Sequence, residues 1–192
     1  MAASAPALDF DTQLMAAAQR GDDRCFTLLV DRHRTQVVQH LCRLVQNPAV
    51  AEELAQDVFL RVYRSRCAWT PSAKFTTWLF RISTNVAYNY FRDQRHHNRN
   101  VSLDRDIPGV RKREYPEPLR SVEEALVDKV RVGRIREAIA SLPVKQRSAV
   151  LMHKYEEMDY SQISQALGCT PSALKALMFR AYESLRKQLA GL

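Results

Sequence analysis

The sequence contains little glycine and no long apolar run. Only 5 of its 192 residues are glycine, which disfavours β-rich folds that need many tight turns. No apolar run approaches the roughly 18 residues that a membrane-spanning helix needs. The first ten residues, MAASAPALDF, lack the basic and then apolar layout of a signal peptide. We therefore expect a helical protein of the cytoplasm.

The sequence also lacks the signatures of common enzymes and metal sites. It has no Walker-type phosphate loop, no G-x-S-x-G and no H-E-x-x-H motif. The cysteines stand far apart and form no C-x-x-C motif: Cys25, Cys42, Cys67 and Cys169. Reduced thiols are the simplest interpretation, with redox sensing or metal binding as the alternatives. We expect no catalytic residue, no metal and no cofactor.

Positive charge is present in excess. Lys and Arg number 29 against 21 Asp and Glu, which gives a formal net charge of +8. A small globular protein this basic usually meets a polyanion, either nucleic acid or anionic lipid. The hydrophobic content of 46% is enough to build packed cores. The composition therefore predicts a folded protein with a polyanionic partner.

Apolar residues at helical spacing predict an all-α fold with two small domains. Residues 9–95 form the first domain, and Asn47 with Pro48 is a typical helix start. The helices predicted in this domain are Asp9–Arg20, Asp23–Val45, Pro48–Arg66 and Thr76–Arg95. Thr70, Pro71 and Ser72 are typical of the loop that precedes the last of them.

Residues 96–119 have little periodicity and predict a flexible linker between the domains. Residues 120–192 form the second domain, in which Ser121 and Glu124 match a capping box and Ser161 is expected to cap a short helix that Gly168 ends. The helices predicted there are Ser121–Ser141, Pro143–Tyr155, Ser161–Leu167 and Thr170–Leu189.

The last two helices have the layout of a helix-turn-helix. With Leu174 at the centre of the buried side, Met178, Ala181 and Leu185 fall on the same side of the last helix. The opposite side is free to enter a major groove, which is wide enough for one helix. The residues on or beside that outer side are Ser172, Lys175, Ala176, Phe179, Arg180, Glu183 and Lys187. Thr170 and Ser172 mark the helix N-terminus, whose N–H groups suit a phosphate.

Aromatic, basic and amide side chains mix within residues 68–99. Bases stack on aromatic rings, cations follow a nucleic-acid backbone and amides read base edges, so this mixture suits single-stranded nucleic acid. The loop 66–74 could provide one wall of a pocket for an extruded base. The alternative is that the aromatics are core residues, because Trp78, Ile82 and Val86 share one helix face.

An acidic patch interrupts this basic chain on the helix after Asn47. Glu53 and Asp57 lie four residues apart on one helix face, with Gln56 beside them. Such a patch repels DNA, so a basic surface of a protein partner is the economical interpretation. An ordinary solvated helix face is the alternative.

The chain resembles the extracytoplasmic-function sigma factors of bacterial RNA polymerase from about Leu14 to Leu189. Four stretches in the same order carry the resemblance: EELAQDVFLRVYRS, FTTWLFRISTNVAYNYFR, SLPVKQRSAVLM and DYSQISQALGCTPSALKALMFRAYESLR. The resemblance implies a subunit without chemistry of its own, which directs core polymerase to promoters and assists promoter melting. It implies as partners the clamp of the beta-prime subunit, the beta flap, promoter DNA and an anti-sigma protein.

The resemblance also implies a role for individual residues. Those implied for the polymerase clamp are Glu53, Gln56 and Asp57. Those implied for the unpaired minus-ten strand are Trp69, Lys74, Phe75, Trp78, Arg81, Asn85, Tyr88 and Arg92. Those implied for the minus-thirty-five duplex are Thr170, Ser172, Lys175, Phe179 and Arg180.

One departure from the family concerns the last helix. Leu177 stands where the family often has a basic residue, and Ala176 replaces a common small polar one. We therefore expect a thinner set of base contacts there. Without the resemblance, an ordinary helix-turn-helix regulator remains the alternative, in which the first domain senses a signal or dimerises.

Overall fold

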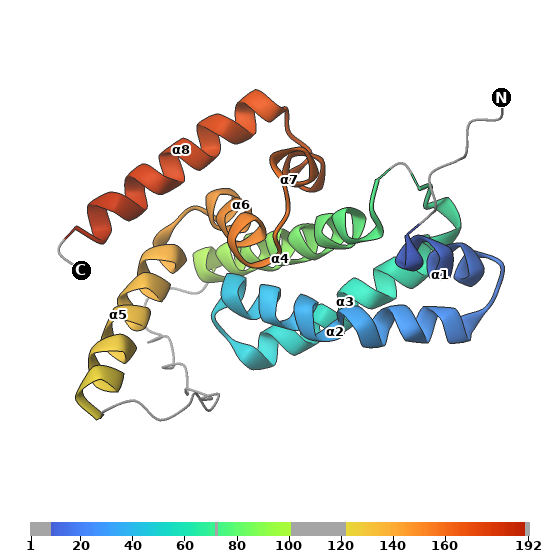
Figure 1. The fold of residues 1–192 in the computed structure, drawn as a ribbon, viewed down its shortest axis with the longest axis horizontal. Coiled ribbons are helices and arrows are strands. Elements are labelled where there is room, and N and C mark those ends of the chain that lie inside the picture. Colours follow the sequence, from blue (N-terminus) through green and yellow to red (C-terminus); the bar gives the residue numbers. More distant parts are fainter. Residues whose placement is uncertain (1–8, 72, 101–121, 191–192) are drawn as a thin grey trace.

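The computed structural model describes residues 9–71, 73–100 and 122–190, and within these ranges the fold is helical and contains no strand (Figure 1). The first domain consists of α1 (Phe10–Gln19), α2 (Asp23–Val45), α3 (Pro48–Ser65), the 3-10 turn η1 (Arg66–Ala68) and α4 (Phe75–Asn100). The second consists of α5 (Val122–Ser141), α6 (Val144–Tyr155), α7 (Tyr160–Leu167) and α8 (Pro171–Gln188). The predicted all-α fold is confirmed.

The helix ends agree with the predicted ones to within one residue except at the end of α4, and one predicted cap differs. Helix α4 continues to Asn100 instead of ending at Arg95, so residues 96–100 of the predicted linker are helical. The rest of that linker and Ser121 lie outside the described residues. Helix α7 is capped by Asp159, so the expected cap at Ser161 is wrong. Asp159 and Gln162 satisfy each other's backbone N–H groups in a capping box, which Ser161 cannot match from inside the helix.

Short polar caps and left-handed residues fix the turns between helices. Asn47 accepts hydrogen bonds from the N–H groups of Ala49 and Val50 and so starts α3. Gly168 has φ of +60° at the end of α7, a conformation that favours glycine. Thr170, only two residues after Gly168, caps the start of α8 by accepting a hydrogen bond from the N–H of Ala173. The tight turn of the helix-turn-helix therefore follows from local sequence.

The core of the first domain lies where α1, α2, α3 and α4 meet. Helices α2 and α3 lie side by side, and α1 and α4 pack onto them (Figure 1). The periodic apolar residues of the sequence supply this core, since Val37, Leu41, Val58, Val62 and Leu79 are all fully buried. Burial of each such side chain stabilises the fold by about 1.5–3 kcal/mol.

The core of the second domain confirms the predicted seam of α8. Leu174, Met178, Ala181 and Leu185 are all buried, and Ile163 of α7 belongs to the same cluster. The seam holds α8 against α6 and α7 and leaves its opposite side exposed. The pattern of the sequence therefore places the charged side of α8 correctly.

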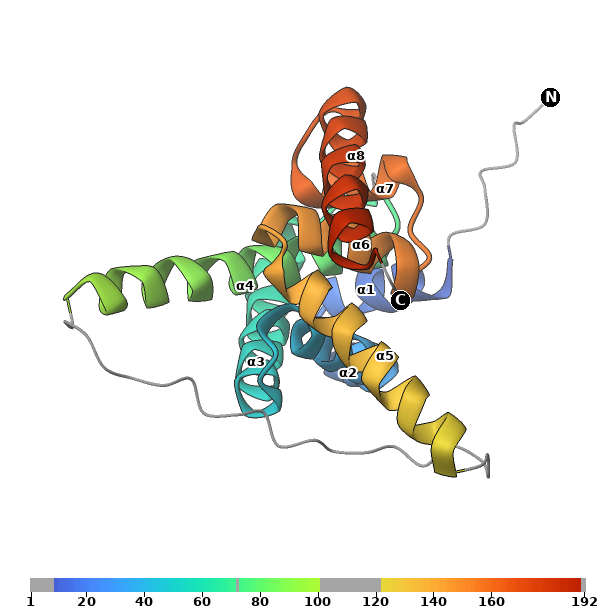
Figure 2. The same cartoon turned by 90° about the vertical axis from the view of Figure 1, so that its left-hand side faces the viewer.

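The two domains are packed against each other. Helix α7 lies against α4 and α6 lies against α2, as the two perpendicular views show (Figures 1 and 2). Phe80 of α4 is 1% exposed and belongs to the core cluster of the second domain, while Leu151 of α6 belongs to that of the first. Periodicity within single helices could not predict this contact, because it depends on which exposed faces meet.

Candidate nucleic-acid and polymerase interfaces

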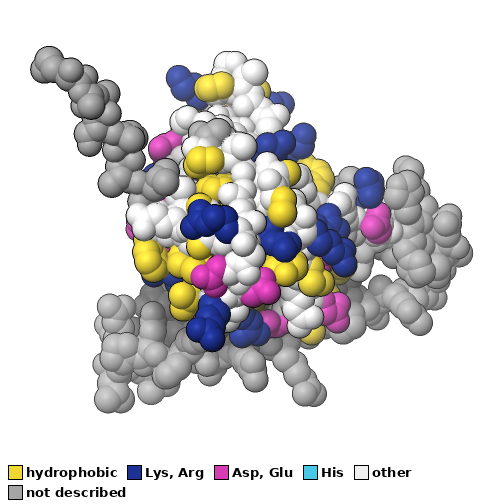
Figure 3. Space-filling model, turned by 90° about the vertical axis from the view of Figure 1, so that its right-hand side faces the viewer, with side chains coloured by type: hydrophobic (Ala, Val, Ile, Leu, Met, Phe, Trp, Pro, Cys, Tyr) yellow, Lys and Arg dark blue, Asp and Glu magenta, His cyan; other side chains and the backbone are white. Residues whose placement is uncertain are grey.

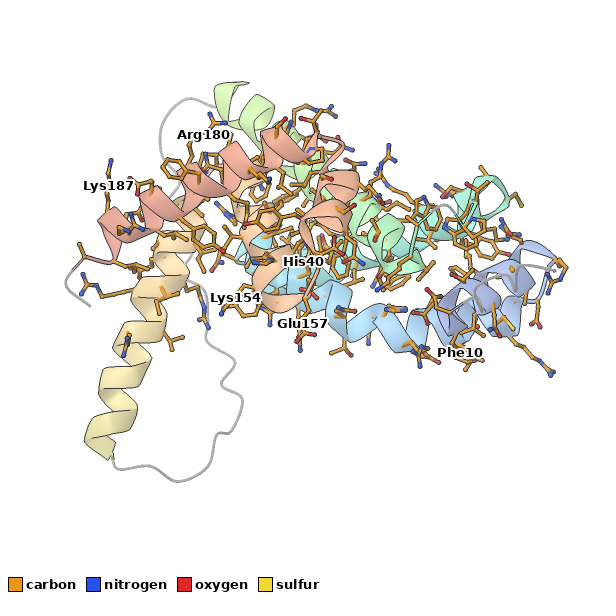
Figure 4. The ribbon with its side chains drawn as sticks, turned by 45° about the horizontal axis from the view of Figure 1, so that its top comes forward. Phe10, His40, Lys154, Glu157, Arg180 and Lys187 are labelled. Atoms are coloured by element: carbon orange, nitrogen blue, oxygen red, sulfur yellow. The ribbon has the colours of Figure 1, made fainter. Side chains whose placement is uncertain are left out.

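The outer side of α8 carries an exposed basic and aromatic surface. Lys175 and Arg180 are exposed, and the ring of Phe179 is 69% exposed. Arg180 and Lys187 lie on the side of the helix that faces away from the rest of the protein (Figure 4). An apolar ring among cations suits a major groove, where phosphates flank base edges and thymine methyl groups.

The start of α8 holds the two predicted hydroxyl residues together. Thr170 caps the helix, and its Oγ1 lies 3.1 Å from the Oγ of Ser172. Both residues are exposed beside the first N–H groups of the helix, where an anion is favoured. Leu177 is half-buried and packs against the core cluster of the domain. Its apolar side chain therefore contributes to the packing of α8.

Replacing Lys175 with alanine is expected to weaken binding to a minus-thirty-five duplex. Lys175 is exposed, so the loss reflects a base contact of roughly 1–3 kcal/mol and leaves the stability of the fold unchanged. Fluorescence anisotropy on a matched promoter duplex measures it. Lys187→Ala, at the other end of the same helix, is the control and should chiefly lower the salt dependence of binding. Equal affinity of Lys175→Ala and the wild type would reject the role.

Four of the predicted strand-binding residues form one stripe on α4. Arg81, Asn85, Tyr88 and Arg92 recur at the spacing that places side chains on one helix face. Arg81, Asn85 and Arg92 are exposed and Tyr88 is half-buried. Lys74 is exposed just before the helix begins. The stripe therefore presents cations, an amide and a ring along a single line, an arrangement that suits a single strand.

Two of the predicted strand-binding rings are enclosed instead. Trp69 is 6% exposed and Phe75 is 1% exposed, and both belong to the core of the first domain. Each ring lies against Trp78, with centroid distances of 6.3 Å and 6.1 Å respectively. Gln19 of α1 holds the loop from inside by donating to the carbonyl oxygens of Arg66 and Trp69. Trp69 and Phe75 are therefore packed beneath the loop, whereas half-buried Trp78 reaches the surface.

The predicted polymerase-binding residues lie on the open side of α3. Glu53 and Gln56 are exposed, and Asp57 is partly exposed while its carboxylate lies 2.9 Å from Nη2 of Arg61. Beside them a groove of about 530 Å³ runs between α3 and α4. Its lining comprises Leu54, Asp57, Arg61, Val86, Asn89, Tyr90, Asp93 and Gln94. Burial, and secondarily the charge of Glu53, raises the pKa of Tyr90 above its ordinary value.

The end of the molecule that carries α1 and the loop before α4 has a mixed surface. Lys and Arg side chains alternate there with hydrophobic and acidic ones and do not merge into a single basic patch (Figure 3). The basic residues on this face are therefore interspersed with other side chains.

Comparison with known proteins identifies the family. Residues 29–97 match sigma-70 region 2, and residues 133–185 match sigma-70, region 4. The RNA polymerase sigma factor CarQ of Myxococcus xanthus is 33% identical over 173 residues, which cover 90% of this chain and 93% of the relative. The chain belongs to the extracytoplasmic-function sigma factors. As a sigma factor, it directs RNA polymerase to promoters.

Two further comparisons cover nearly the whole chain. The RNA polymerase sigma-H factor of Pseudomonas aeruginosa is 28% identical over 184 residues, which cover 95% of each chain. The solved structure of CnrH in complex with the cytosolic domain of CnrY superposes with a TM-score of 0.69 at 20% identity. It covers 95% of this sigma factor and 98% of that chain, which supports the helical fold described above.

Sequence reasoning missed part of the surface of this sigma factor. Asn89, Tyr90 and Asp93 were not expected near the acidic helix, but α4 brings them beside Asp57. Their helical spacing was visible, whereas the pairing of α3 with α4 was not.

Within the described ranges, no helix combines the length and apolarity that crossing a bilayer requires.

Proposed function

We propose that the two domains of this sigma factor divide promoter recognition between them. The first domain, residues 9–95, binds the polymerase clamp through Glu53, Gln56 and Asp57 and holds the unpaired minus-ten strand along the α4 stripe. The second domain, residues 120–192, binds the minus-thirty-five duplex through the outer side of α8. Residues 96–119 join the two domains in the sequence, and the beta flap of core polymerase is a further proposed partner of the chain.

The observation that supports this division most strongly is the pair of unlike faces on one domain. The acidic face of α3 suits a basic protein surface, whereas the stripe of Arg81, Asn85 and Arg92 on α4 suits nucleic acid. An ordinary helix-turn-helix regulator needs neither face. Because Trp69 and Phe75 are buried, we assign direct strand contact to Lys74, Trp78, Arg81, Asn85, Tyr88 and Arg92.

Two further properties belong to the proposal. The chain is a transcription initiation factor and not an enzyme, because the polymerase forms the phosphodiester bonds, and it acts in the cytoplasm beside that polymerase. An anti-sigma protein is a proposed partner. It is supported by the solved structure of the sigma factor RpoE in complex with the anti-sigma factor NepR from Bartonella quintana, which has this fold with a TM-score of 0.65.

Reconstitution with core polymerase tests the proposal. We expect the purified chain to co-elute with core enzyme and to start transcription at discrete sites on genomic DNA. Mapping the 5′ ends of transcripts made with and without the chain should reveal a shared upstream element in two parts. Failure to bind core enzyme, together with tight binding to single duplex operators, would favour the regulator.

A further inference from the structure

A buried carboxylate of the second domain is inserted into the first. The side chain of Glu156, at the end of α6, is only 2% exposed. The amide of Gln36 donates to one of its oxygens at 2.8 Å. The other oxygen lies 3.4 Å from Nδ1 of His40 and 3.8 Å from Nη1 of Arg43. All three partners come from α2, so one acidic side chain joins the two domains.

Other polar and aromatic contacts also join the two domains. The ring of Phe80 meets that of His40 edge-on, with centroids 4.9 Å apart. The guanidinium of Arg147 donates across the interface to the carbonyl oxygen of Leu44, and burial lowers its pKa below the ordinary value. The ammonium of Lys145 lies 5.8 Å from the centre of the Tyr88 ring. The second domain therefore reaches the edge of the strand-binding stripe.

Some buried polar groups at the contact between the two domains lack a hydrogen-bond partner among the described residues. Thr77 and Thr84 lie on the same face of α4 as Phe80, and their hydroxyl oxygens are buried without a hydrogen-bond partner among the described residues. Unpaired buried hydroxyls oppose the packing, and water can satisfy them when the domains separate. A buried carboxylate among α2 side chains likewise depends on its partners being in place. Such a contact is suited to opening.

In the packed arrangement, the two domains lie too close together to occupy both promoter elements at once. The names of the elements place them about 25 base pairs apart, which is about 85 Å of duplex at 3.4 Å per base pair. Both domains pack along α4, whose 26 residues span about 39 Å at 1.5 Å per residue. The domains must therefore part before α4 and α8 can occupy their elements together.

We propose that Glu156 is a latch that holds this chain in a closed form, defined by the contact of α6 and α7 with α2 and α4. Opening of the latch makes the chain competent to span a promoter. The latch itself follows from the contacts of Glu156, whereas its consequence for transcription rests on the proposed function above.

Charge reversal at Glu156 tests the latch on the full-length chain. Glu156→Lys places a cation beside His40 and Arg43, and small-angle X-ray scattering should show a radius of gyration several ångström above that of the wild type. Glu157→Lys is the matched control, because Glu157 is the next residue, is exposed and lies at the outer edge of the contact (Figure 4). Its radius should equal that of the wild type. Circular dichroism must show unchanged helix content in both variants.

A substitution on the other domain keeps the test valid if Glu156→Lys folds poorly. Gln36→Glu sets a second carboxylate against Glu156 and should open the chain to a similar extent. Combining Gln36→Glu with Glu156→Lys restores an attractive pair and should return the radius toward the wild-type value. A folded Glu156→Lys or Gln36→Glu variant that scatters like the wild type would overturn the latch.

Scattering separates this proposal from the proposed function, because it needs neither polymerase nor DNA. In an assay of polymerase-loaded chain on a promoter that carries both elements, opening should tighten the apparent dissociation constant for the promoter by up to about tenfold if the wild-type chain is open roughly a tenth of the time. A larger radius without tighter binding would keep the latch and contradict its role in transcription.

Discussion

Replacing Asp57 with arginine lowers the affinity of the chain for core polymerase at least tenfold. Asp57 lies on the open side of α3 with Glu53 and Gln56, where its carboxylate is partly exposed and neighbours Arg61. An arginine here turns an attractive contact with a basic partner into a like-charge contact, which costs several kcal/mol. Loss of roughly 2–5 kcal/mol corresponds to a reduction well above tenfold. Titration of labelled chain with core enzyme measures it.

A matched control separates this effect from a general change of charge. Asp31→Arg makes the same substitution at an exposed residue of α2, outside the acidic face of α3. It should bind core enzyme like the wild type, and both variants should bind an isolated minus-thirty-five duplex normally. Unchanged polymerase affinity in Asp57→Arg would show that α3 does not contact the clamp.

Replacing Leu174 with alanine destabilises the second domain by about 3–5 kcal/mol, because it leaves a cavity in a fully buried seam. Leu174 is 0% exposed and joins α8 to the cluster that contains Ile163 and Met178. Since small domains are stable by only about 5–15 kcal/mol, α8 should detach and duplex binding should fall sharply. Urea unfolding followed by circular dichroism measures the change.

The neighbouring residue provides the contrast for this experiment. Lys175→Ala truncates the next side chain of the same helix but faces solvent, so it should weaken duplex binding without lowering stability. The two substitutions therefore separate the packing side of α8 from its binding side. Equal stability of Leu174→Ala and the wild type would mean that the seam does not hold the helix.

Regular periodicity made the helices and the two sides of α8 predictable. Leu174, Met178, Ala181 and Leu185 recur at helical spacing. A helix that buries one side packs with its apolar side toward the core, so these residues define the buried side of α8. Helix-capping rules predicted the start of a helix less well where two residues could each serve as the cap. At the start of α7, Asp159 and Ser161 both suit a cap, and the capping box with Gln162 decides in favour of Asp159.

The dual nature of aromatic residues limited prediction in the first domain. Trp69 and Phe75 suit both base stacking and a core, and only the path of the loop over α1 shows that both are enclosed. The groove beside Asp57 and the buried site of Glu156 are each formed by side chains from different helices. Neither could be derived from the order of residues, because it depends on how helices pair.

The most direct test of the central claim is strand opening by reconstituted polymerase. With core enzyme and this chain, thymines of the minus-ten element should become reactive to permanganate on a promoter identified by 5′-end mapping. A variant with Arg81→Glu and Arg92→Glu alters two exposed cations of the α4 stripe. It should still bind core enzyme and the upstream duplex, but it should leave those thymines paired. If the wild-type complex recognised promoters without unpairing any of them, the division of labour between the two domains would be contradicted.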